Sequence, residues 1–410
     1  ITAAKSRSTR RSMDKWLNQI IEGDCLEVMR ELPDNSIDAV VTDPPYELGF
    51  MGKKWDSTGI AYNVELWQEV LRVLKPGGHL LSFGGTRTYH RMACAIEDAG
   101  FEIRDQMQWI YGSGFPKSMD ISKAIDKQAG AKREVIGRNP NSRENCNKSN
   151  TLYQSGTVGK TDYITAPATL EAKQWDGWGT ALKPAHEPIV LARKPLSEKT
   201  VAENVLKWGT GGINIDGCRI PTDETITNHS RSTESSKSKG KYGDSRAQET
   251  HQTQGQKLGR FPANVILDEE AGKLLDEQSG VSKSNTRQPT GGQILNPETG
   301  WNQNAMIDKT VRGYNDAGGA SRFFYIAKAS KKERGEGNNH PTVKPQSLMR
   351  YLCRLVTPPG GTVLEPFAGS GTTILAATEE GFNVMGIEKE PKYCNIIRER
   401  MNALQGRLAL

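Results

Sequence analysis

The sequence predicts an α/β protein with a doubly wound sheet. Two β-like runs support this prediction: Ser36–Thr42, which leads into Asp43-Pro44-Pro45-Tyr46, and Thr362–Leu364, which leads into a glycine-rich turn. A helical run, Thr373–Glu380, and a third strand-like run, Asn383–Ile387, follow that turn. Strands that alternate with helices in this way are typical of βαβ units, whose strands form a parallel sheet.

The front of the chain continues the alternation. The expected elements are a strand at Leu17–Ile21, a short helix ending at Leu32, the strand at Ser36–Thr42, a helix over Val64–Leu74, a strand at His79–Phe83 and a helix over Tyr89–Ala99. Lys75-Pro76-Gly77-Gly78 is expected to break the chain before the strand at His79, because proline and glycine interrupt regular structure. The runs Glu102–Tyr111 and His186–Ala192 are expected to form a closing hairpin.

The string Asp43-Pro44-Pro45-Tyr46 suits the binding of a planar heterocycle that carries an NH2 group. The two prolines fix φ and remove backbone donors, so neighbouring carbonyls stay free to accept hydrogen bonds. The Asp43 carboxylate and the Pro44 carbonyl would accept the two N–H bonds of such an amine, and the Tyr46 ring would stack on the heterocycle. An Asp-Pro turn that simply closes a strand is the alternative interpretation.

The turn Gly369-Ser370-Gly371 suits a nucleotide-like ligand, because glycine lets the backbone approach a ligand closely. It lacks the third glycine of the dinucleotide fingerprint and the Gly-Lys-Ser/Thr of a phosphate loop. Glu388 ends the strand after the turn, where an acid can accept hydrogen bonds from ribose hydroxyls. A solvated strand end is the alternative interpretation of Glu388 taken alone.

These motifs, in this order, resemble those of the site-specific DNA amino-methyltransferases, the adenine-N6/cytosine-N4 family, and in particular its permuted β group. The resemblance covers about residues 13–116 and 338–410 and a short piece at 186–195. It implies a doubly wound Rossmann-like methyltransferase sheet that is circularly permuted and carries a large inserted DNA-recognition region. It also implies S-adenosylmethionine as the cofactor and double-stranded DNA as the partner.

The resemblance assigns roles to individual residues. The expected catalytic residues are Asp43, Pro44, Pro45 and Tyr46. The expected cofactor-binding residues are Asp24, Cys25, Asp43, His340, Thr342, Lys344, Glu365, Phe367, Gly369, Ser370, Gly371, Thr372, Glu388 and Lys389. The expected DNA-binding residues are Lys53, Lys54, Lys237, Lys239, Lys241 and Arg260. No metal site is expected, because the histidines show no metal-ligand spacing.

The expected domains follow the same pattern. They are a basic arm or expression remnant at 1–12, a catalytic half at 13–195 with an insertion at about 117–180, a target-recognition region at 196–338, and a cofactor-binding half at 339–410. Residues 117–340 hold 33 Lys and Arg against 26 Asp and Glu, whereas the rest of the chain holds 21 against 22. Excess positive charge in the insert suits a module that faces a polyanion. A homodimer is left open.

The residues also narrow the chemistry. Methylation of cytosine at carbon-5 needs a thiolate nucleophile, which follows a proline in that family, and this chain contains no Pro-Cys pair. An amine attacks the methyl group directly, once its base has been flipped from the duplex. Adenine N6 is favoured because cytosine-N4 members more often carry Ser in place of Asp43. Cytosine-N4 methylation, a catalytically silent DNA-binding relative and protein-glutamine methylation remain alternatives, and a restriction partner is not decided.

Composition favours a cytoplasmic protein, and the resemblance implies a bacterial or phage origin. No apolar run approaches the ~20 residues of a membrane span, and no secretory signal is expected. The six cysteines are scattered without a Cys-x-x-Cys pair. This pattern is typical of free thiols in a reducing compartment.

The polar run Pro221–Arg260 is expected to order on DNA, because it holds few large apolar residues and many basic ones. Replacing Lys237, Lys239 and Lys241 together by Ala should weaken binding to all DNA sequences without changing the site that is methylated, since phosphate contacts position and base contacts specify. Fluorescence anisotropy should show a shallower salt dependence, in which log K loses roughly 0.9 per phosphate for each tenfold rise in salt. An unchanged slope would place this run away from DNA.

Overall fold

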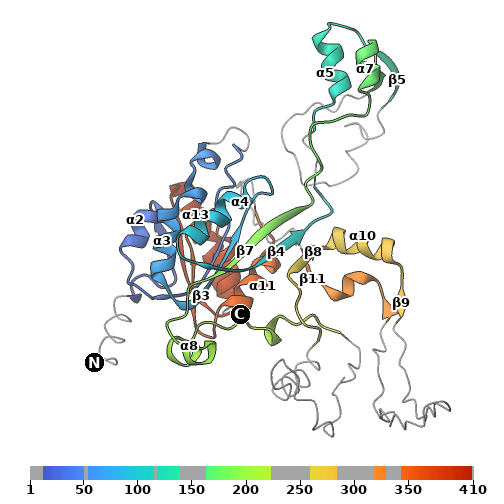
Figure 1. Cartoon of the computed structure of the whole chain (residues 1–410). Helices are drawn as coiled ribbons and strands as arrows, with labels where there is room; N and C mark the ends of the chain where they lie inside the picture. The colour runs from blue at the N-terminus through green and yellow to red at the C-terminus, as the bar shows by residue number, and fades with distance from the viewer. Residues whose placement is uncertain are drawn as a thin grey trace, which may run out of the picture. The chain divides into compact units, whose positions relative to one another are not determined.

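The computed structural model describes residues 13–49, 54–114, 118–138, 163–222, 259–283, 317–328 and 343–408. These described residues fall into two compact units, one within 1–112 and 186–410 and the other within 113–185. Figure 1 shows the elements of both. Seven residues with expected roles have no described side chain: Lys53, Lys237, Lys239, Lys241, His340 and Thr342 lie outside these ranges, and of Lys54 the backbone alone is described.

The larger unit contains a nine-stranded sheet with the order β1-β13-β12-β2-β3-β7-β4-β8-β11 (Figure 1). Its strands are β1 (Gln19–Glu22), β2 (Ile37–Thr42), β3 (Leu74–Phe83), β4 (Glu102–Ile110), β7 (His186–Arg193), β8 (Val265–Asp268), β11 (Tyr325–Ala327), β12 (Thr362–Glu365) and β13 (Asn383–Glu388). Neighbouring strands are parallel, except that β7 runs antiparallel to both β3 and β4. The C-terminal strands lie between β1 and β2, which confirms the predicted circular permutation.

Helices cover both faces of this sheet. They are α2 (Cys25–Arg30), α3 (Val64–Val73), α4 (Tyr89–Asp98), α8 (Val201–Trp208), α10 (Glu269–Ser279), α11 (Gln346–Val356), α12 (Thr372–Glu379) and α13 (Pro391–Leu408), with short 3-10 helices η2 (Lys54–Ser57), η3 (Ile60–Tyr62), η4 (Asp216–Cys218) and η6 (Ala320–Phe323). Val40 of β2 packs with α2, α3 and α4, whereas Ala39 and Val41 pack with α11, α12 and α13. Alternate strand residues point to opposite faces, so β2 is buried on both sides.

The sheet changes direction between β12 and β2. From β12 the chain passes through α12 to β13 on one side, and from β2 it passes through α3 to β3 on the other. Val363 and Leu364 pair with Ala39 and Val40, so the carboxyl ends of the two strands lie together. In open α/β sheets, ligands bind beyond the carboxyl ends of the strands at such a switch point. The loops after β2 and β12 therefore define the region in which to look for a site.

The predicted break at Lys75–Gly78 is a bulge inside a strand instead. Strand β3 begins at Leu74, directly after α3, and its pairing with β2 shifts between Leu74 and His79. Ile37 pairs with Leu74 and Ala39 pairs with His79, so two steps along β2 correspond to five steps along β3. The proline and glycines are thus absorbed in the sheet because a β-bulge tolerates unpaired residues.

Helix α8 explains why the bulge contains glycine. Gly77 has φ +79°, and a Cβ there would lie 2.5 Å from Nδ2 of Asn204. That amide is fully buried and donates to the carbonyls of Pro76 and Thr210, at 2.8 Å each. The bulge is therefore the docking site of α8.

Part of the region predicted for target recognition extends the main sheet. Strand β8 pairs with β4, and β11 pairs with β8. Between them lie α10 and the small strand pair β9 (Ser282–Lys283) and β10 (Ala317–Gly318). Across the described ranges, no helix is both long and apolar enough to cross a membrane.

The smaller unit is organised around a buried ion pair. It contains α5 (Ile121–Gln128), the hairpin of β5 (Glu134–Arg138) and β6 (Tyr163–Ala166), and α7 (Leu170–Gln174). Arg133 lies 2.7 Å from Asp126, which also accepts hydrogen bonds from the backbone of Ala168 and Thr169. Burial works to raise the pKa of Asp126, but these donors lower it to about 2.

The buried amide of Asn204 yields a stability prediction. Asn204→Ala should lower the free energy of unfolding by about 1–3 kcal/mol, because two carbonyls lose their buried donor. Urea denaturation of the full chain measures the change. Leu206→Ala on the same helix is the control, since Leu206 is 89% exposed and its loss should cost less than about 0.5 kcal/mol. Equal effects of the two substitutions would contradict the assigned role of Asn204.

Candidate active site

One buried carboxylate joins the two loops at the switch point. Glu365 ends β12 and is 2% exposed. Its Oε1 accepts hydrogen bonds from Thr42 Oγ1 and from the backbone N–H of Phe367, and its Oε2 accepts from Thr373 Oγ1. Thr42 directly precedes Asp43, so Glu365 ties the loop Asp43–Tyr46 to the glycine turn.

The environment of Glu365 changes its ionisation. Burial raises its pKa to about 8, although the hydrogen bonds from Thr42 and Thr373 oppose that shift. The nearby Asp43 carboxylate adds to the rise. All three protein donors are directed at this side chain, which makes it a structural connection between the loops.

The glycine turn has the backbone shape that its sequence suggests. Gly369 and Gly371 have φ +52° and +83°, which disfavour other residues. A Cβ on Gly371 would also lie 2.8 Å from Ile397 of α13. Glycine at 371 is therefore required by packing, in addition to the expected close approach of a ligand. Next to it, Ser370 is buried and its carbonyl accepts from Arg400.

The neighbouring strand ends add two carboxylates. Glu388, at the end of β13, accepts from the backbone N–H of Gly369 at 2.7 Å and of Glu390 at 2.8 Å. Burial raises the pKa of Glu388, and these hydrogen bonds oppose the rise. The carboxylate therefore lies at the turn, with lone pairs left for further donors.

Asp24 follows β1, which pairs with β13 at Glu22 and Glu388. Its side chain caps α2 by accepting from the N–H of Leu26 and lies 3.2 Å from Lys389. Burial works to raise its pKa, but the Lys389 ammonium and the backbone donor lower it.

Three further residues expected at the cofactor, Cys25, Phe367 and Thr372, pack beneath this edge of the sheet. Cys25 is buried, which raises the pKa of its thiol to about 12. Phe367 packs with the core on the side of α2 and α3, and Thr372 opens α12 as a buried residue. These three side chains support the edge that carries Asp24, Glu388 and the glycine turn.

On the other side of the switch point, Lys344 holds three side chains together. Its Nζ lies 2.6 Å from Asp43 Oδ2, 3.1 Å from the Tyr46 hydroxyl and 3.2 Å from Glu187 Oε2. The Tyr46 hydroxyl also donates to Glu187 at 2.7 Å. The structure thus places Lys344, expected at the cofactor, against the Asp43 loop.

Asp43 has one engaged and one free carboxylate oxygen. Oδ2 is bound by Lys344, whereas Oδ1 is buried and has no hydrogen-bond partner among the residues that the structure describes. A buried acceptor without a donor is costly, so such an atom commonly marks a place that a ligand donor completes. Burial works to lower the pKa of Lys344, but the carboxylates of Asp43 and Glu187 outweigh it and raise that pKa.

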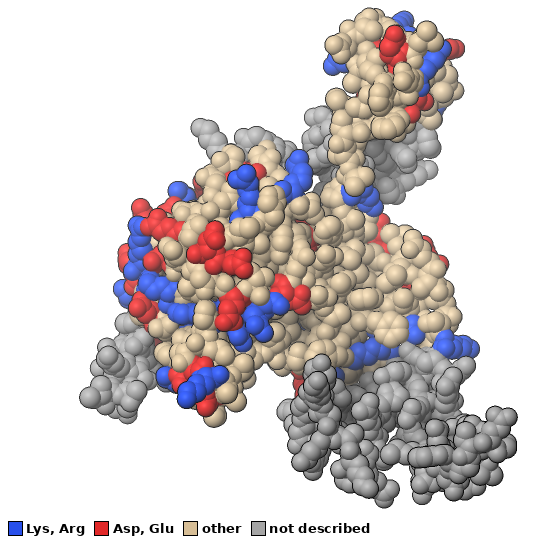
Figure 2. Space-filling model, viewed as in Figure 1, with Lys and Arg blue, Asp and Glu red and all other residues tan. Residues whose placement is uncertain are grey.

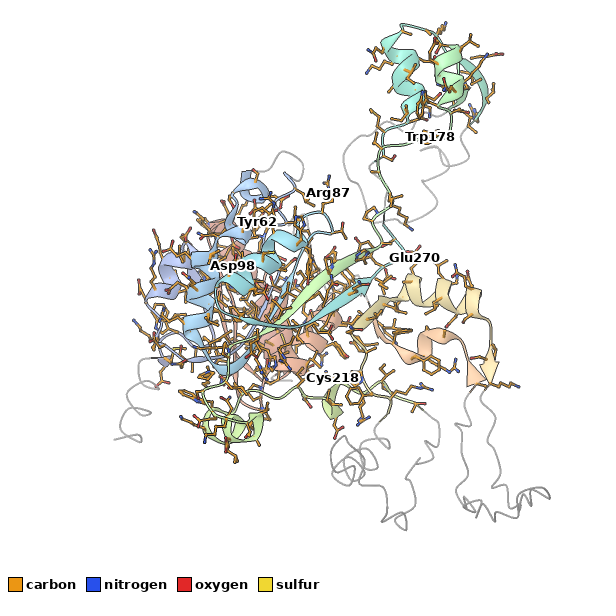
Figure 3. All side chains as sticks on the ribbon, in the orientation of Figure 1. Tyr62, Arg87, Asp98, Trp178, Cys218 and Glu270 are labelled. Atoms are coloured by element: carbon orange, nitrogen blue, oxygen red, sulfur yellow. The ribbon has the colours of Figure 1, made fainter. Side chains whose placement is uncertain are left out.

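The Tyr46 ring borders a narrow surface depression. Tyr62, Gly84 and Gly85 also line it, and Figure 3 shows Tyr62 beside the loop that carries Arg87. Burial raises the pKa of Tyr46, and the carboxylates of Asp43 and Glu187 add to the rise. The hydroxyl therefore stays protonated and able to donate.

Sequence reasoning missed Glu187 and Thr42. Glu187 is the second residue of β7, whose antiparallel direction brings its N-terminal end to the carboxyl ends of β3 and β4. The usable signal was an acidic residue at the start of a strand already expected to close a hairpin. Thr42 gave no signal, because a threonine at the end of a buried strand is ordinary.

Arg260, expected at DNA, belongs to a group of arginines and phenylalanines. Its guanidinium lies 4.9 Å from the Phe323 ring centre, and that of Arg322 lies 4.3 Å from the same ring. Phe323 is 42% exposed.

Figure 2 shows basic and acidic side chains interspersed over the region of α2 and α3. In the described ranges, no three His, Cys, Asp or Glu side chains gather as metal ligands do.

Comparison with known proteins decides the class. A family model of DNA methylases, of the N6/N4 type, matches residues 37–399. The chain belongs to the N6/N4 DNA methylase family. A methylase of this family acts on DNA, and the matched range includes the Asp43 loop, Glu187, Lys344 and the glycine turn.

The relative and the solved structures named below share few identical residues with this methylase. The type II methyltransferase M.HindIII of Haemophilus influenzae is 23% identical over 341 residues, which cover 82% of this chain and 68% of that protein. Among solved structures, the complex of M1.HpyAVI with SAM is 16% identical, covers 93% of this chain and 98% of its own, and has a TM-score of 0.39. The cytosine-N4-specific PvuII DNA methyltransferase is 14% identical, covers 95% and 91%, and has a TM-score of 0.42.

The raised pKa of Glu365 yields a pH prediction. Its folded pKa of about 8 exceeds the ordinary 4.5, so its contribution to the stability of the methylase is complete below pH 4.5 and is lost as the pH rises through 8. Glu365→Gln, which cannot ionise, should remove that part of the pH dependence. Urea denaturation between pH 5 and 9 measures it, with exposed Glu97→Gln as the control. Parallel pH curves for wild type and Glu365→Gln would contradict the raised pKa.

Proposed function

We propose that this methylase transfers a methyl group from S-adenosylmethionine to the exocyclic N6 amine of adenine in specific sites of double-stranded DNA. The observation that supports the proposal best is the buried Oδ1 of Asp43 at the switch point, which has no hydrogen-bond partner in the part of the chain that the structure describes. It is an acceptor positioned for an amine donor, and it lies in the loop next to the glycine turn that Glu365 holds in place.

The residues on the β1–β13–β12 side fit the cofactor. Glu388 lies at the end of the second strand of the unit, where a ribose would meet its free lone pairs. Asp24 follows the adjacent strand and is the proposed contact for the cofactor adenine. The turn Gly369–Gly371 would border the methionine part. When bound, the cofactor would supply an electrophilic methyl group, which the amine nitrogen would take as the carbon–sulfur bond breaks. S-adenosylhomocysteine would leave, and the methylated nitrogen would lose one of its protons.

The Asp43 loop would hold the target amine. Asp43 Oδ1 and the Pro44 carbonyl accept its two N–H bonds, and they keep the nitrogen where its lone pair leaves conjugation with the ring. Acceptors fixed in advance favour the positive charge that develops on this nitrogen. The Asp43 carboxylate is oriented by Lys344, so the amine is aligned with the methyl group before reaction.

A base inside a duplex cannot reach this loop, so the target adenine is flipped out. Tyr46 is the proposed stacking platform, and its ring orientation is fixed through its hydroxyl by Glu187 and Lys344. Asp at position 43, in place of the Ser more often seen in cytosine-N4 relatives, favours adenine.

The region 196–338 is proposed to read the DNA site. It carries Arg260 with Arg322 and the exposed Phe323, and it is joined to the catalytic sheet through β8 and β11. Guanidinium groups bind phosphates and base edges, so this region is suited to a duplex. We also propose that the protein is located in the cytoplasm of a bacterium or is encoded by a phage.

Nucleoside mass spectrometry tests the chemistry. PCR-amplified genomic DNA, which carries no methylated amines, is incubated with the full chain and S-adenosylmethionine and then digested to nucleosides. N6-methyl-2′-deoxyadenosine is the expected product. N4-methyl-2′-deoxycytidine would replace the adenine assignment, and the absence of both products would contradict the proposed activity.

Asp43→Ala tests the carboxylate. The substitution should lower the single-turnover methylation rate by roughly 10²–10³-fold, because the preorganised acceptor is lost, while calorimetric affinity for S-adenosylmethionine stays near that of wild type. Asp98→Ala, an exposed aspartate of α4 that Figure 3 labels, is the control and should leave the rate unchanged. A near-normal rate in Asp43→Ala would contradict the assignment.

A further inference from the structure

Glu187 reaches the candidate active site from β7, which is distant in sequence from both the Asp43 loop and the glycine turn. It pairs with Trp109 across the β4–β7 hairpin, one residue from the N-terminal end of β7. Because β7 runs against its neighbours, this end lies with the carboxyl ends of β3 and β4. Its side chain is 20% exposed. The residue thus belongs geometrically to the edge that carries the Asp43 loop.

Among the described residues, the side-chain contacts of Glu187 are with Tyr46 and Lys344, which lie against Asp43. Its Oε2 accepts from the Tyr46 hydroxyl at 2.7 Å and lies 3.2 Å from the Lys344 ammonium. Lys344 in turn binds Asp43 Oδ2 at 2.6 Å. The ammonium also lies 4.8 Å from the Phe83 ring centre, so its surroundings are largely buried. Movement of Glu187 would therefore release both Tyr46 and Lys344.

The charges explain why an acid is needed there. Asp43 and Lys344 alone form a neutral pair, and the ammonium opposes positive charge on an amine held at Asp43 Oδ1. A second carboxylate beside the same ammonium makes the group net negative. In a site that is mostly shielded from water, this difference is larger than it would be in solvent. Glu187 thereby offsets the repulsion that Lys344 would exert on the methylated nitrogen.

We propose that Glu187 is a positioning residue for amine methylation. It holds the Tyr46 hydroxyl and the Lys344 ammonium so that Asp43 presents Oδ1 to the amine, and its charge compensates that of Lys344. This inference rests on the proposed function, since it assumes that the amine binds at Asp43. It adds to that function a residue on β7 that acts through Tyr46 and Lys344.

Glu187→Gln separates charge from shape. The variant should lower the single-turnover methylation rate on PCR-amplified genomic DNA roughly 10- to 100-fold. Affinity for S-adenosylmethionine by calorimetry, and for the same DNA by filter binding, should stay within about twofold, because binding does not develop the charge. Glu187→Asp keeps the charge and should recover part of the rate. An active Gln variant combined with an inactive Asp variant would overturn the proposal, because shape alone would then matter.

A second pair of variants tests the route through Lys344. In a Lys344→Met background, Glu187→Gln should cause little further loss, since the charge to be compensated is gone. Fully additive losses of rate in the double variant would overturn the inference that Glu187 acts through Lys344. The matched control is Glu102→Gln, because Glu102 also bonds a cation of the β4–β7 hairpin, Arg193, at the far end of the strands. Its rate should equal that of wild type.

The same assay separates the two levels of failure. A wild type that transfers no methyl group to DNA amines would overturn the proposed function and this inference together. An active wild type with an impaired Asp43→Ala and a normal Glu187→Gln would leave the proposed function standing and overturn the role of Glu187.

Discussion

The whole site depends on the buried carboxylate of Glu365. Three donors from different segments converge on it: the Thr42 hydroxyl at the end of β2, the Phe367 N–H in the turn, and the Thr373 hydroxyl in α12. Thr42 and Glu365 are 323 positions apart in the chain. The two loops that circular permutation separates in sequence are thus joined at one point, and the raised pKa of Glu365 reflects the burial that this junction requires.

The two acids nearest the switch point are used differently. Glu365 has both oxygens occupied by protein donors, so it can contribute little to a ligand. Asp43 has one oxygen occupied by Lys344 and one buried oxygen without a partner among the described residues. Buried polar groups are normally satisfied. We therefore expect the unsatisfied carboxylate, Asp43, to serve function, and the satisfied carboxylate, Glu365, to serve stability.

The antiparallel direction of strand β7 adds a residue from the start of a strand to the edge of the sheet that carries the site. Parallel strands bring only their carboxyl ends to the site, whereas β7 brings the start of a strand and with it Glu187. That carboxylate completes a group in which Lys344 is shared by Asp43, Tyr46 and Glu187. The alignment of the Asp43 loop hence depends on a segment distant in sequence from both family motifs.

The sequence by itself determined the order of strands and helices, the Asp43 loop, the glycine turn and Glu388, because each depends on local residue types and spacing. It also indicated that the C-terminal strands join the same sheet as the N-terminal strands. Tertiary structure alone decided that Lys75–Gly78 forms a bulge for α8, that β8 and β11 extend the sheet, and that Lys344 and Glu187 meet at Asp43. These outcomes depend on contacts between residues far apart in the chain, and periodicity along one segment holds no information about which partner another segment will bring.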